Sequence, residues 1–201
     1  MPILKREPDV YPEDLFSRDQ PDLPWRVAYL HARRVKALAR FLRERRLAFY
    51  LPQQEKEGIY GGRRRLSHLP LFPGYVFIKT DAVDRNTVYQ SNQVVRILDV
   101  EDQGLLDRQL RHIWALQQGG ALLVPHPYLG PGDEVKITHG PFRGLTGTVI
   151  REKGRTRLVV SVTFLRQAVA VEVDRDLLAP AEQSRRDVRR KAEPASAAQA
   201  I

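Results

Sequence analysis

The chain has no cysteine, no long apolar run and only one methionine among its 201 residues. Without cysteine it can form neither a disulfide framework nor a thiolate metal site. No segment approaches the ~18 consecutive apolar residues of a membrane-spanning helix, and the first residues, MPILKREPDVYPED, lack the apolar core of a secretory signal. We therefore expect a cytoplasmic protein whose core forms without covalent staples.

Catalytic signatures are also missing. The five histidines have no metal-ligand spacing, and the glycines between 140 and 147 are not followed by the Lys-Ser/Thr pair of a phosphate-binding loop. No acid–base or nucleophilic constellation is visible. The sequence predicts a binding or regulatory protein with no metal and no cofactor, and not an enzyme.

Charge is distributed unevenly. The formal net charge is +9, and residues 25–118 hold 17 basic and 9 acidic side chains, a net +8, whereas residues 119–130 hold no Lys, Arg, Asp or Glu. The excess indicates either an ordinary solvated surface or a polyanionic partner of the first folded unit.

The order of apolar patterns predicts an α+β fold in two units. Residues 25–118 follow the order β-α-β-β-α-β with a terminal helix, which is typical of an antiparallel sheet with helices on one face. Residues 132–180 contain five short strands and predict a small all-β barrel. The remaining segments are predicted to be a disordered N-terminal extension (1–24), a linker (119–131) that is partly ordered by Leu122, Leu123 and Tyr128, and a disordered or frayed basic tail (181–201).

Two short segments are more specific. Residues 70–79, Pro-Leu-Phe-Pro-Gly-Tyr-Val-Phe-Ile-Lys, place a Pro-Gly turn before an aromatic strand. Residues 132–147 combine Gly-Asp-Glu-Val with Gly-Pro-Phe-Arg-Gly-Leu-Thr-Gly, whose glycines allow a tight turn at a barrel edge. A basic stripe on the predicted helix 33–46 precedes both, formed by Arg33, Lys36, Arg40 and Arg43.

These features resemble the NusG family of transcription elongation factors, and particularly its specialised antiterminator paralogues such as RfaH. The resemblance covers about residues 25–180. It implies an NGN domain that binds RNA polymerase, followed by a KOW domain with an SH3-like barrel that recruits a second partner, in a monomer. Transcription elongation and antitermination is the implied function.

The resemblance also assigns polymerase-binding residues. A hydrophobic depression that docks on the β′ clamp helices should include Phe72, Pro73, Tyr75 and Phe77. The alternative is a core role, because strand alternation places Tyr75 and Phe77 together on one face. A contact with the β subunit is implied for Asn86 and Thr87, whose alternative role is to start a helix.

Two further surfaces follow from the same resemblance. Phosphates of non-template or upstream DNA should meet the predicted strand–helix corner and hairpin, although a solvated face is the alternative: His31, Arg33, Arg34, Arg63, Arg64 and Arg65. The KOW domain should bind a small-subunit ribosomal protein or Rho through Phe142, Arg155 and Phe164. Alternation with Val160 and Val162 favours a core position for Phe164, and a Gly-rich turn favours a surface position for Phe142.

Other functions stay open at this point. A general NusG-type elongation or termination factor is the alternative within the family, and a structural, ribosome-associated KOW protein that binds RNA is the alternative from another class. β-Branched residues are dense in 157–173, which predicts a permanently β-structured C-terminal domain. On a flexible linker, such a domain would leave the aromatic strand accessible.

Overall fold

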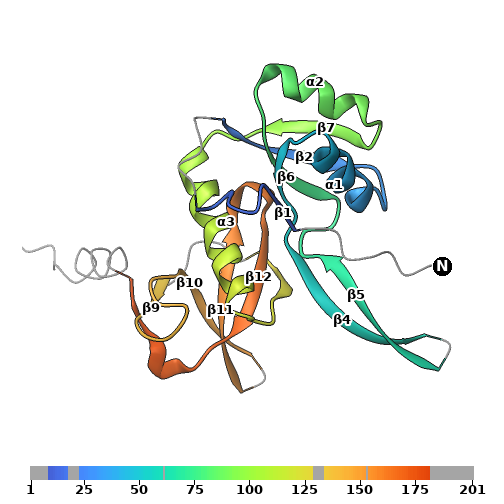
Figure 1. Ribbon diagram of the computed structural model, residues 1–201. Coiled ribbons are helices and arrows are strands. Elements are labelled where there is room, and N and C mark those ends of the chain that lie inside the picture. Colours follow the sequence, from blue (N-terminus) through green and yellow to red (C-terminus); the bar gives the residue numbers. More distant parts are fainter. Residues whose placement is uncertain (1–8, 18–22, 61, 129–133, 153, 182–201) are drawn as a thin grey trace, which may run out of the picture.

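The described residues form two antiparallel sheets with one helix packed between them, two further helices on the N-terminal sheet and a projecting hairpin (Figure 1). The computed structural model describes residues 9–17, 23–60, 62–128, 134–152 and 154–181. The α+β class predicted from the sequence is confirmed. Within these residues, no helix is long and apolar enough to cross a membrane.

The N-terminal sheet has the strand order β1-β3-β6-β2-β7, and all its neighbouring strands are antiparallel. Its central strands are short and rich in aromatic and β-branched residues, which suit a pleated surface. The strands are β1 (Val10–Tyr11), β2 (Trp25–Leu30), β3 (Ala48–Tyr50), β6 (Tyr75–Lys79) and β7 (Val94–Asp99).

Helices cover both faces of this sheet, so the prediction that they lie on one face is wrong. Val27 and Ala28 are neighbours on β2 and are both fully buried, which means that each face needs an apolar cover. On one face, α1 (Val35–Glu44) and α2 (Ala82–Gln90) pack over Ala28 and its neighbours. On the other face, α3 (Gln103–Gln118) packs over Val27.

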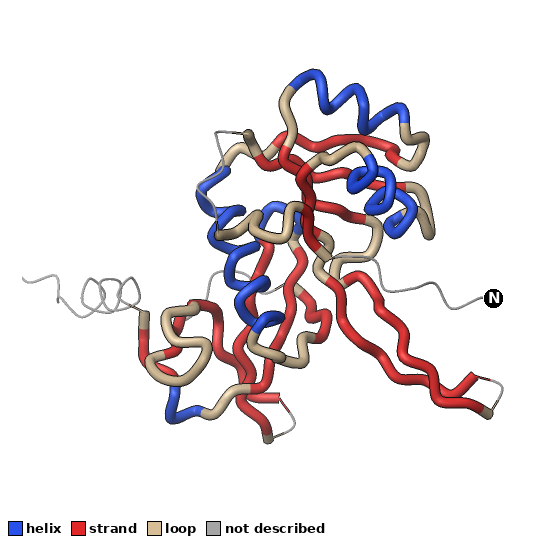
Figure 2. The backbone as a smooth tube through the Cα atoms, viewed as in Figure 1, coloured by secondary structure: helices blue, strands red, loops and turns tan. Residues whose placement is uncertain are grey.

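The hairpin is longer than the sequence suggested. Strands β4 (Gln53–Tyr60) and β5 (Arg63–Pro70) pair along their whole length as a separate two-stranded sheet. In Figure 2 this ribbon extends away from the body of the protein. The sequence predicted a hairpin here but not its length, because charged side chains interrupt the apolar alternation, which a ribbon exposed on both faces tolerates.

The C-terminal sheet is entirely antiparallel and confirms the predicted β structure. Its strand order is β13-β9-β10-β11-β12-β8. Strand β8 lies at the edge, where two prolines that lack N–H groups are tolerated. Its strands are β8 (Val124–Pro127), β9 (Glu134–Ile137), β10 (Thr146–Glu152), β11 (Arg155–Val162), β12 (Gln167–Glu172) and β13 (Leu178–Pro180), with short 3-10 turns η1 (Thr163–Leu165) and η2 (Arg175–Leu177) after β11 and β12.

Two segments that were predicted to lack regular secondary structure contain strands. Strand β1 and the buried side chains of Leu15 and Phe16 lie inside the predicted disordered extension. Strand β8 lies inside the predicted linker and pairs with β12. The prediction of disorder is wrong at residues 9–17, because buried apolar side chains and a strand partner outweigh local Pro-rich composition. In the linker, strand pairing adds a regular element to a segment that was predicted to be only partly ordered. The predicted tail lies outside the described residues from 182 onward.

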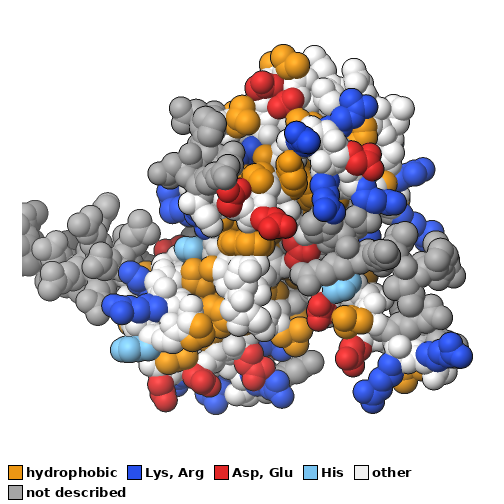
Figure 3. Space-filling view, viewed as in Figure 1, with side chains coloured by type: hydrophobic (Ala, Val, Ile, Leu, Met, Phe, Trp, Pro, Cys, Tyr) orange, Lys and Arg blue, Asp and Glu red, His pale blue; other side chains and the backbone are white. Residues whose placement is uncertain are grey.

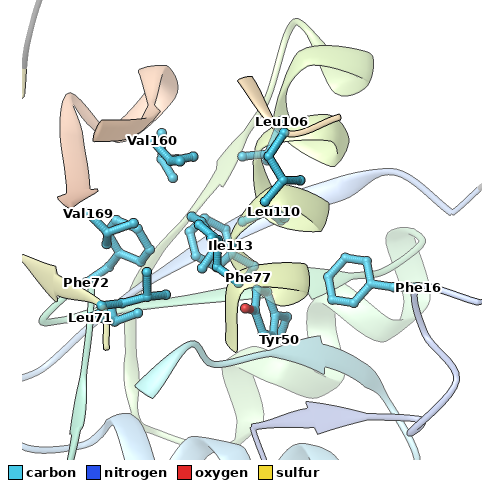
Figure 4. Close-up of a cluster of buried hydrophobic side chains, with 14 of the residues drawn as sticks. Phe16, Tyr50, Leu71, Phe72, Phe77, Leu106, Leu110, Ile113, Val160 and Val169 are labelled. Carbon is cyan, nitrogen blue, oxygen red and sulfur yellow. The ribbon is translucent and has the colours of Figure 1, made fainter. Parts of the chain in front are cut away.

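One apolar cluster joins the two sheets. Figure 4 shows Leu106, Leu110 and Ile113 of α3 between the N-terminal sheet and Val160, with Phe72 beside Val169 of β12. All of these side chains are buried to 2% exposure or less. The C-terminal sheet therefore docks on α3 and on the turn before β6, and the two units share a core.

The stability of the C-terminal sheet should depend on Gly147 of β10. A Cβ at this position would lie 2.6 Å from the carbonyl oxygen of Val159 on β11, and backbone gives way less easily than a flexible side chain. We expect Gly147→Ala to lower the free energy of unfolding by about 1–3 kcal/mol, as overpacking typically does. Gly104→Ala, whose Cβ would meet only the side chains of Arg108 and Asp102, is the matched control. Equal melting temperatures for the two variants would contradict this role of Gly147.

Candidate functional site

The aromatic turn and strand are split between the interior and the surface. Phe72 and Phe77 are 1% and 0% exposed, and their rings pack edge to face with centroids 5.7 Å apart. The turn is closed by Tyr75, whose backbone N–H donates to the carbonyl oxygen of Phe72 at 3.1 Å. Alternation is as predicted, because Tyr75 and Phe77 face the α3 side while Val76 and Ile78 face the α1 side.

An aromatic pair stays exposed at the rim of this apolar face. Tyr75 is half-buried, Tyr29 is 39% exposed, and their ring centroids are 5.3 Å apart. Pro73 is exposed in the adjoining turn, and Arg96 of β7 lies opposite Tyr29 in the sheet. Sequence reasoning did not select Tyr29, although its alternation with Trp25 and Val27 places it on the same face.

The C-terminal sheet covers the deeper part of the aromatic turn. Gln109 of α3 donates to the hydroxyl of Thr163 at 2.8 Å and accepts the backbone N–H of Thr163 at 3.1 Å. The ring of Phe142 packs on Gly119, where a Cβ would lie 2.2 Å from a ring carbon. The expectation of an accessible aromatic strand is therefore wrong for Phe72 and Phe77, because apolar burial against α3 and β12 holds the C-terminal sheet over them.

Helix α2 carries the two residues assigned to a β-subunit contact. Asn86 is exposed and Thr87 is half-buried, both in the middle of the helix. The alternative that they start the helix is wrong, because Asp81 is the N-cap and accepts the backbone N–H of Asp84 at 2.7 Å.

Ion pairs fix α2 against the sheet. Arg26 of β2 and Arg85 of α2 both contact the carboxylate of Asp99, at 2.7 Å and 3.0 Å. The hydrogen bonds from Arg26 and then Arg85 lower the pKa of Asp99. This arrangement presents the outer surface of α2, including Asn86, in one orientation.

The predicted DNA-binding residues occupy two places. His31, Arg33 and Arg34 are exposed in the turn between β2 and α1. Arg63 and Arg64 are exposed on β5 of the hairpin, and the side chain of Arg65 lies outside the described part of the structure. Figure 3 shows Lys and Arg side chains gathered near α1 and again on the hairpin.

The positive charge at the start of α1 goes against the helix dipole. Arg33 has a left-handed backbone with φ of 64°, and Arg34 is the N-cap without a side-chain cap hydrogen bond. The first turn holds no acidic residue. A helix start normally favours acidic or capping side chains, so local stability does not explain these arginines.

Phe164 and Phe142 of the C-terminal unit differ from their predicted core and surface positions. Phe164 is 37% exposed in the turn η1, so its predicted core position is wrong. Phe142 is half-buried against α3 rather than freely exposed. The 3-10 turn breaks strand alternation after Val162 and rotates Phe164 outward. Arg155 is exposed and pairs with Glu172 at 2.8 Å.

The geometry offers an aromatic rim, two basic regions and an exposed phenylalanine, which are surfaces for macromolecules. Among the described residues, no group of three or more His, Asp or Glu side chains lies close enough to hold a metal ion. The fold is that of a two-unit protein of the α+β class, and these surfaces are its candidate binding sites.

Comparisons with known proteins give the family. Residues 23–112 match the family model described as "Transcription termination factor nusG". The chain is 32% identical over 138 residues to the transcription termination/antitermination protein NusG of Escherichia coli (strain K12), a match that covers 62% of this chain and 72% of that protein. The corresponding protein of Buchnera aphidicola is 30% identical over 132 residues, with the same coverage. The chain belongs to the NusG family.

A solved structure is also similar in part. It is described as "Domain interaction in Thermotoga maritima NusG", and it shares 21% sequence identity with this chain. The overlap spans 79% of this chain and 97% of that one at a TM-score of 0.42. At that score the overlap does not define a common arrangement of the two units.

Docking of the C-terminal sheet should weaken in acid because of His112 on α3. Burial lowers the pKa of His112 below 6.5, and the nearby Arg108 lowers it further, whereas a backbone hydrogen bond with Thr146 of β10 raises it. Because the pKa of His112 is lowered in the docked state, the undocked state binds more protons as the pH falls. Docking is fully stabilised above pH 6.5 and weakens as the pH falls through that value.

We expect amide chemical shifts of β10 to report this loosening between about pH 8 and about pH 5. His112→Gln should make the same shifts independent of pH in that range. His126→Gln, on the edge strand β8, is the control variant and should keep the transition. If the pH transition of these shifts remained in the His112→Gln variant, the transition would belong to another titratable group.

Proposed function

We propose that this protein is a transcription elongation and antitermination factor that binds RNA polymerase through its N-terminal α+β unit. The aromatic face of the N-terminal sheet docks on the β′ clamp helices through Phe72, Pro73, Tyr75 and Phe77, and Tyr29 extends this surface. The observation that carries the proposal is the aromatic pair of Tyr29 and Tyr75, which is partly exposed beside a buried apolar cluster in a member of the NusG family. Large aromatic side chains at a rim are common anchors of protein interfaces.

Full use of this surface requires movement of the C-terminal sheet. Phe72 is 1% exposed and lies in the cluster that includes Val169. A partner can first meet Tyr29, Tyr75 and Pro73 and then reach Phe72 once the sheet leaves α3. The two Gln109–Thr163 hydrogen bonds and the Phe142–Gly119 contact oppose that movement.

Nucleic acid is the second proposed partner. Exposed arginines at the start of α1 and on the hairpin would neutralise phosphates of non-template or upstream DNA without reading sequence. The unfavourable placement of Arg33 and Arg34 at the positive end of the α1 dipole supports this role over a simply solvated face. Asn86 of α2 and its neighbour Thr87 would add a contact with the β subunit.

The C-terminal sheet is proposed to be a KOW domain that recruits a small-subunit ribosomal protein or Rho. Phe164 is the preferred anchor, since it is exposed on a turn next to the docked interface, with Arg155 and Phe142 as further contacts. A general elongation or termination role, rather than a specialised one, is the alternative within the family. A ribosome-associated RNA-binding role would need no aromatic rim on the N-terminal sheet.

Polymerase binding should depend on the aromatic rim. We expect the double variant Tyr29→Ala/Tyr75→Ala to lose about 2 kcal/mol or more of binding free energy to core RNA polymerase, as truncated aromatic anchors do. Both side chains are partly exposed, so the variant should remain folded. Phe164→Ala, with a similar exposed fraction on the C-terminal sheet, is the control.

Pull-down of polymerase by the purified variants measures this effect, and circular dichroism checks their folding. Gly119→Ala, which places a Cβ against Phe142, should loosen the docked sheet and increase polymerase capture. The double variant Gly119→Ala/Phe142→Ala removes the clash between the new Cβ at position 119 and the ring of Phe142. Undiminished capture by the folded Tyr29→Ala/Tyr75→Ala variant would refute the assignment of this face.

DNA binding by the arginines should appear as a change in salt dependence. Replacing Arg33 and Arg34, or Arg63 and Arg64, by Gln should reduce the slope of log affinity against log salt by about 0.7–0.9 for each phosphate that is no longer neutralised. Fluorescence anisotropy with a single-stranded and a duplex DNA of equal length measures the slope. The same substitutions at Arg143, in the turn before β10, and at Arg151 of β10, which are both exposed in the C-terminal unit, are the matched control. If the slope of log affinity against log salt were the same for all pairs, these arginines would form only a solvated surface.

A further inference from the structure

Residues 9–17 form a short segment that precedes the family match, which begins at residue 23. We call this segment the N-terminal strap. Three of its side chains are buried, Val10 to 7%, Leu15 to 1% and Phe16 to 8% exposure. A segment of nine residues that buries three apolar side chains is held in place by the rest of the protein.

The strap is bound along one edge of the N-terminal sheet. Its strand β1 pairs antiparallel with β3, with Val10 opposite Tyr50 and Tyr11 opposite Phe49. The backbone N–H of Leu51 then donates to the carbonyl oxygen of Asp9. These bonds cover the free edge of β3 just before the chain enters the hairpin.

The C-terminal end of the strap packs against α3. The ring of Phe16 lies 5.0 Å from Tyr50, 5.5 Å from Trp114 and 6.0 Å from Trp25, measured between centroids. Arg111 of α3 donates to the carbonyl oxygen of Phe16 and lies over its ring at 5.7 Å. The strap and α3 are therefore fastened by both apolar and polar contacts.

A polar network connects the strap to the root of the hairpin. The carboxylate of Asp9 accepts a hydrogen bond from the side-chain amide of Gln53, the first residue of β4, at 3.0 Å. The carbonyl oxygen of Gln53 accepts from the side chain of Gln117 of α3 at 2.7 Å, and Gln117 in turn accepts from the hydroxyl of Tyr50. Gln53 is 6% exposed, so these bonds form in a largely water-excluded place.

The hairpin depends on its root for direction. Strands β4 and β5 belong to neither large sheet, so no ladder of hydrogen bonds fixes the angle at which the ribbon leaves the body. An isolated two-stranded ribbon is only marginally stable and can pivot where it joins a domain. At the root, the backbone N–H of Leu71 donates to the carbonyl oxygen of Pro52 and closes the hairpin, whereas Gln53 bonds to the strap and to α3.

We propose that the N-terminal strap is a positioning element for the hairpin, and that Asp9, acting through Gln53, sets the direction of the ribbon. This inference rests on the proposed function in one respect, since the aimed tip is the proposed nucleic-acid contact at Arg63 and Arg64. The strap thereby gives this chain a rigidly directed basic ribbon, by means of residues that lie outside the family match.

Distance measurements between spin labels test the direction of the ribbon. The chain has no cysteine, so Ile59→Cys on the hairpin and Glu44→Cys on α1 can be labelled without background; Ile59 is 74% exposed and Glu44 is exposed. We expect Asp9→Ala to widen the distance distribution roughly twofold, because the acceptor at the root is removed. Asp9→Asn keeps an acceptor oxygen and should restore the narrow distribution.

Glu13→Ala is the matched control, since it removes an exposed carboxylate from the same strap. Thermal melting of each variant separates direction from stability, because loss of stability alone would leave the distribution narrow well below the melting temperature. An unchanged distribution in Asp9→Ala, or failure of Asp9→Asn to restore it, would overturn the proposal.

DNA anisotropy on the same variants separates this inference from the proposed function. Weaker binding by Asp9→Ala, together with a wider distribution, supports both. A wider distribution with unchanged DNA affinity, in a protein whose Arg63→Gln/Arg64→Gln variant also binds normally, supports the positioning role and rejects the DNA contact of the hairpin.

Discussion

The burial of helix α3 between two sheets is the contact on which the rest of the structure depends. Leu106, Leu110 and Ile113 are all 1% exposed or less, and they belong to the same cluster as side chains from both units. At ~25 cal/mol for each Å² of apolar surface buried, an interface of this kind outweighs the few hydrogen bonds around it. It makes one body of two units that the sequence presents as separate.

This contact decides which functional surfaces are open. The aromatic rim, the arginines before α1 and the hairpin all lie on the N-terminal unit and are at least partly exposed, whereas Phe72 is buried in the cluster that joins the two units. The turn after β11 is held to α3 by Gln109, yet its Phe164 points outward. Any binding event that needs Phe72 must compete with the docked sheet, so its apparent affinity falls by the fraction of molecules that are open.

Sequence reasoning was most successful where local periodicity determines the structure. The alternation in β6, the helix after residue 103 and strands β9 to β12 of the C-terminal sheet were predicted, because periods of 2.0 and 3.6 are properties of the chain itself. It failed for Phe142 and Phe164. Their burial depends on a 3-10 turn and on a neighbour, Gly119, that is distant in sequence.

By itself, the sequence determined the α+β class, the order of the two units, the family and the residue types available for binding aromatic and phosphate groups. Tertiary structure alone decided that residues 9–17 close the edge of β3, that helices cover both faces of the N-terminal sheet, and that the C-terminal sheet covers Phe72. The reason is physical. The local sequence pattern indicates which side chains are buried, but only tertiary packing determines which apolar surfaces contact one another.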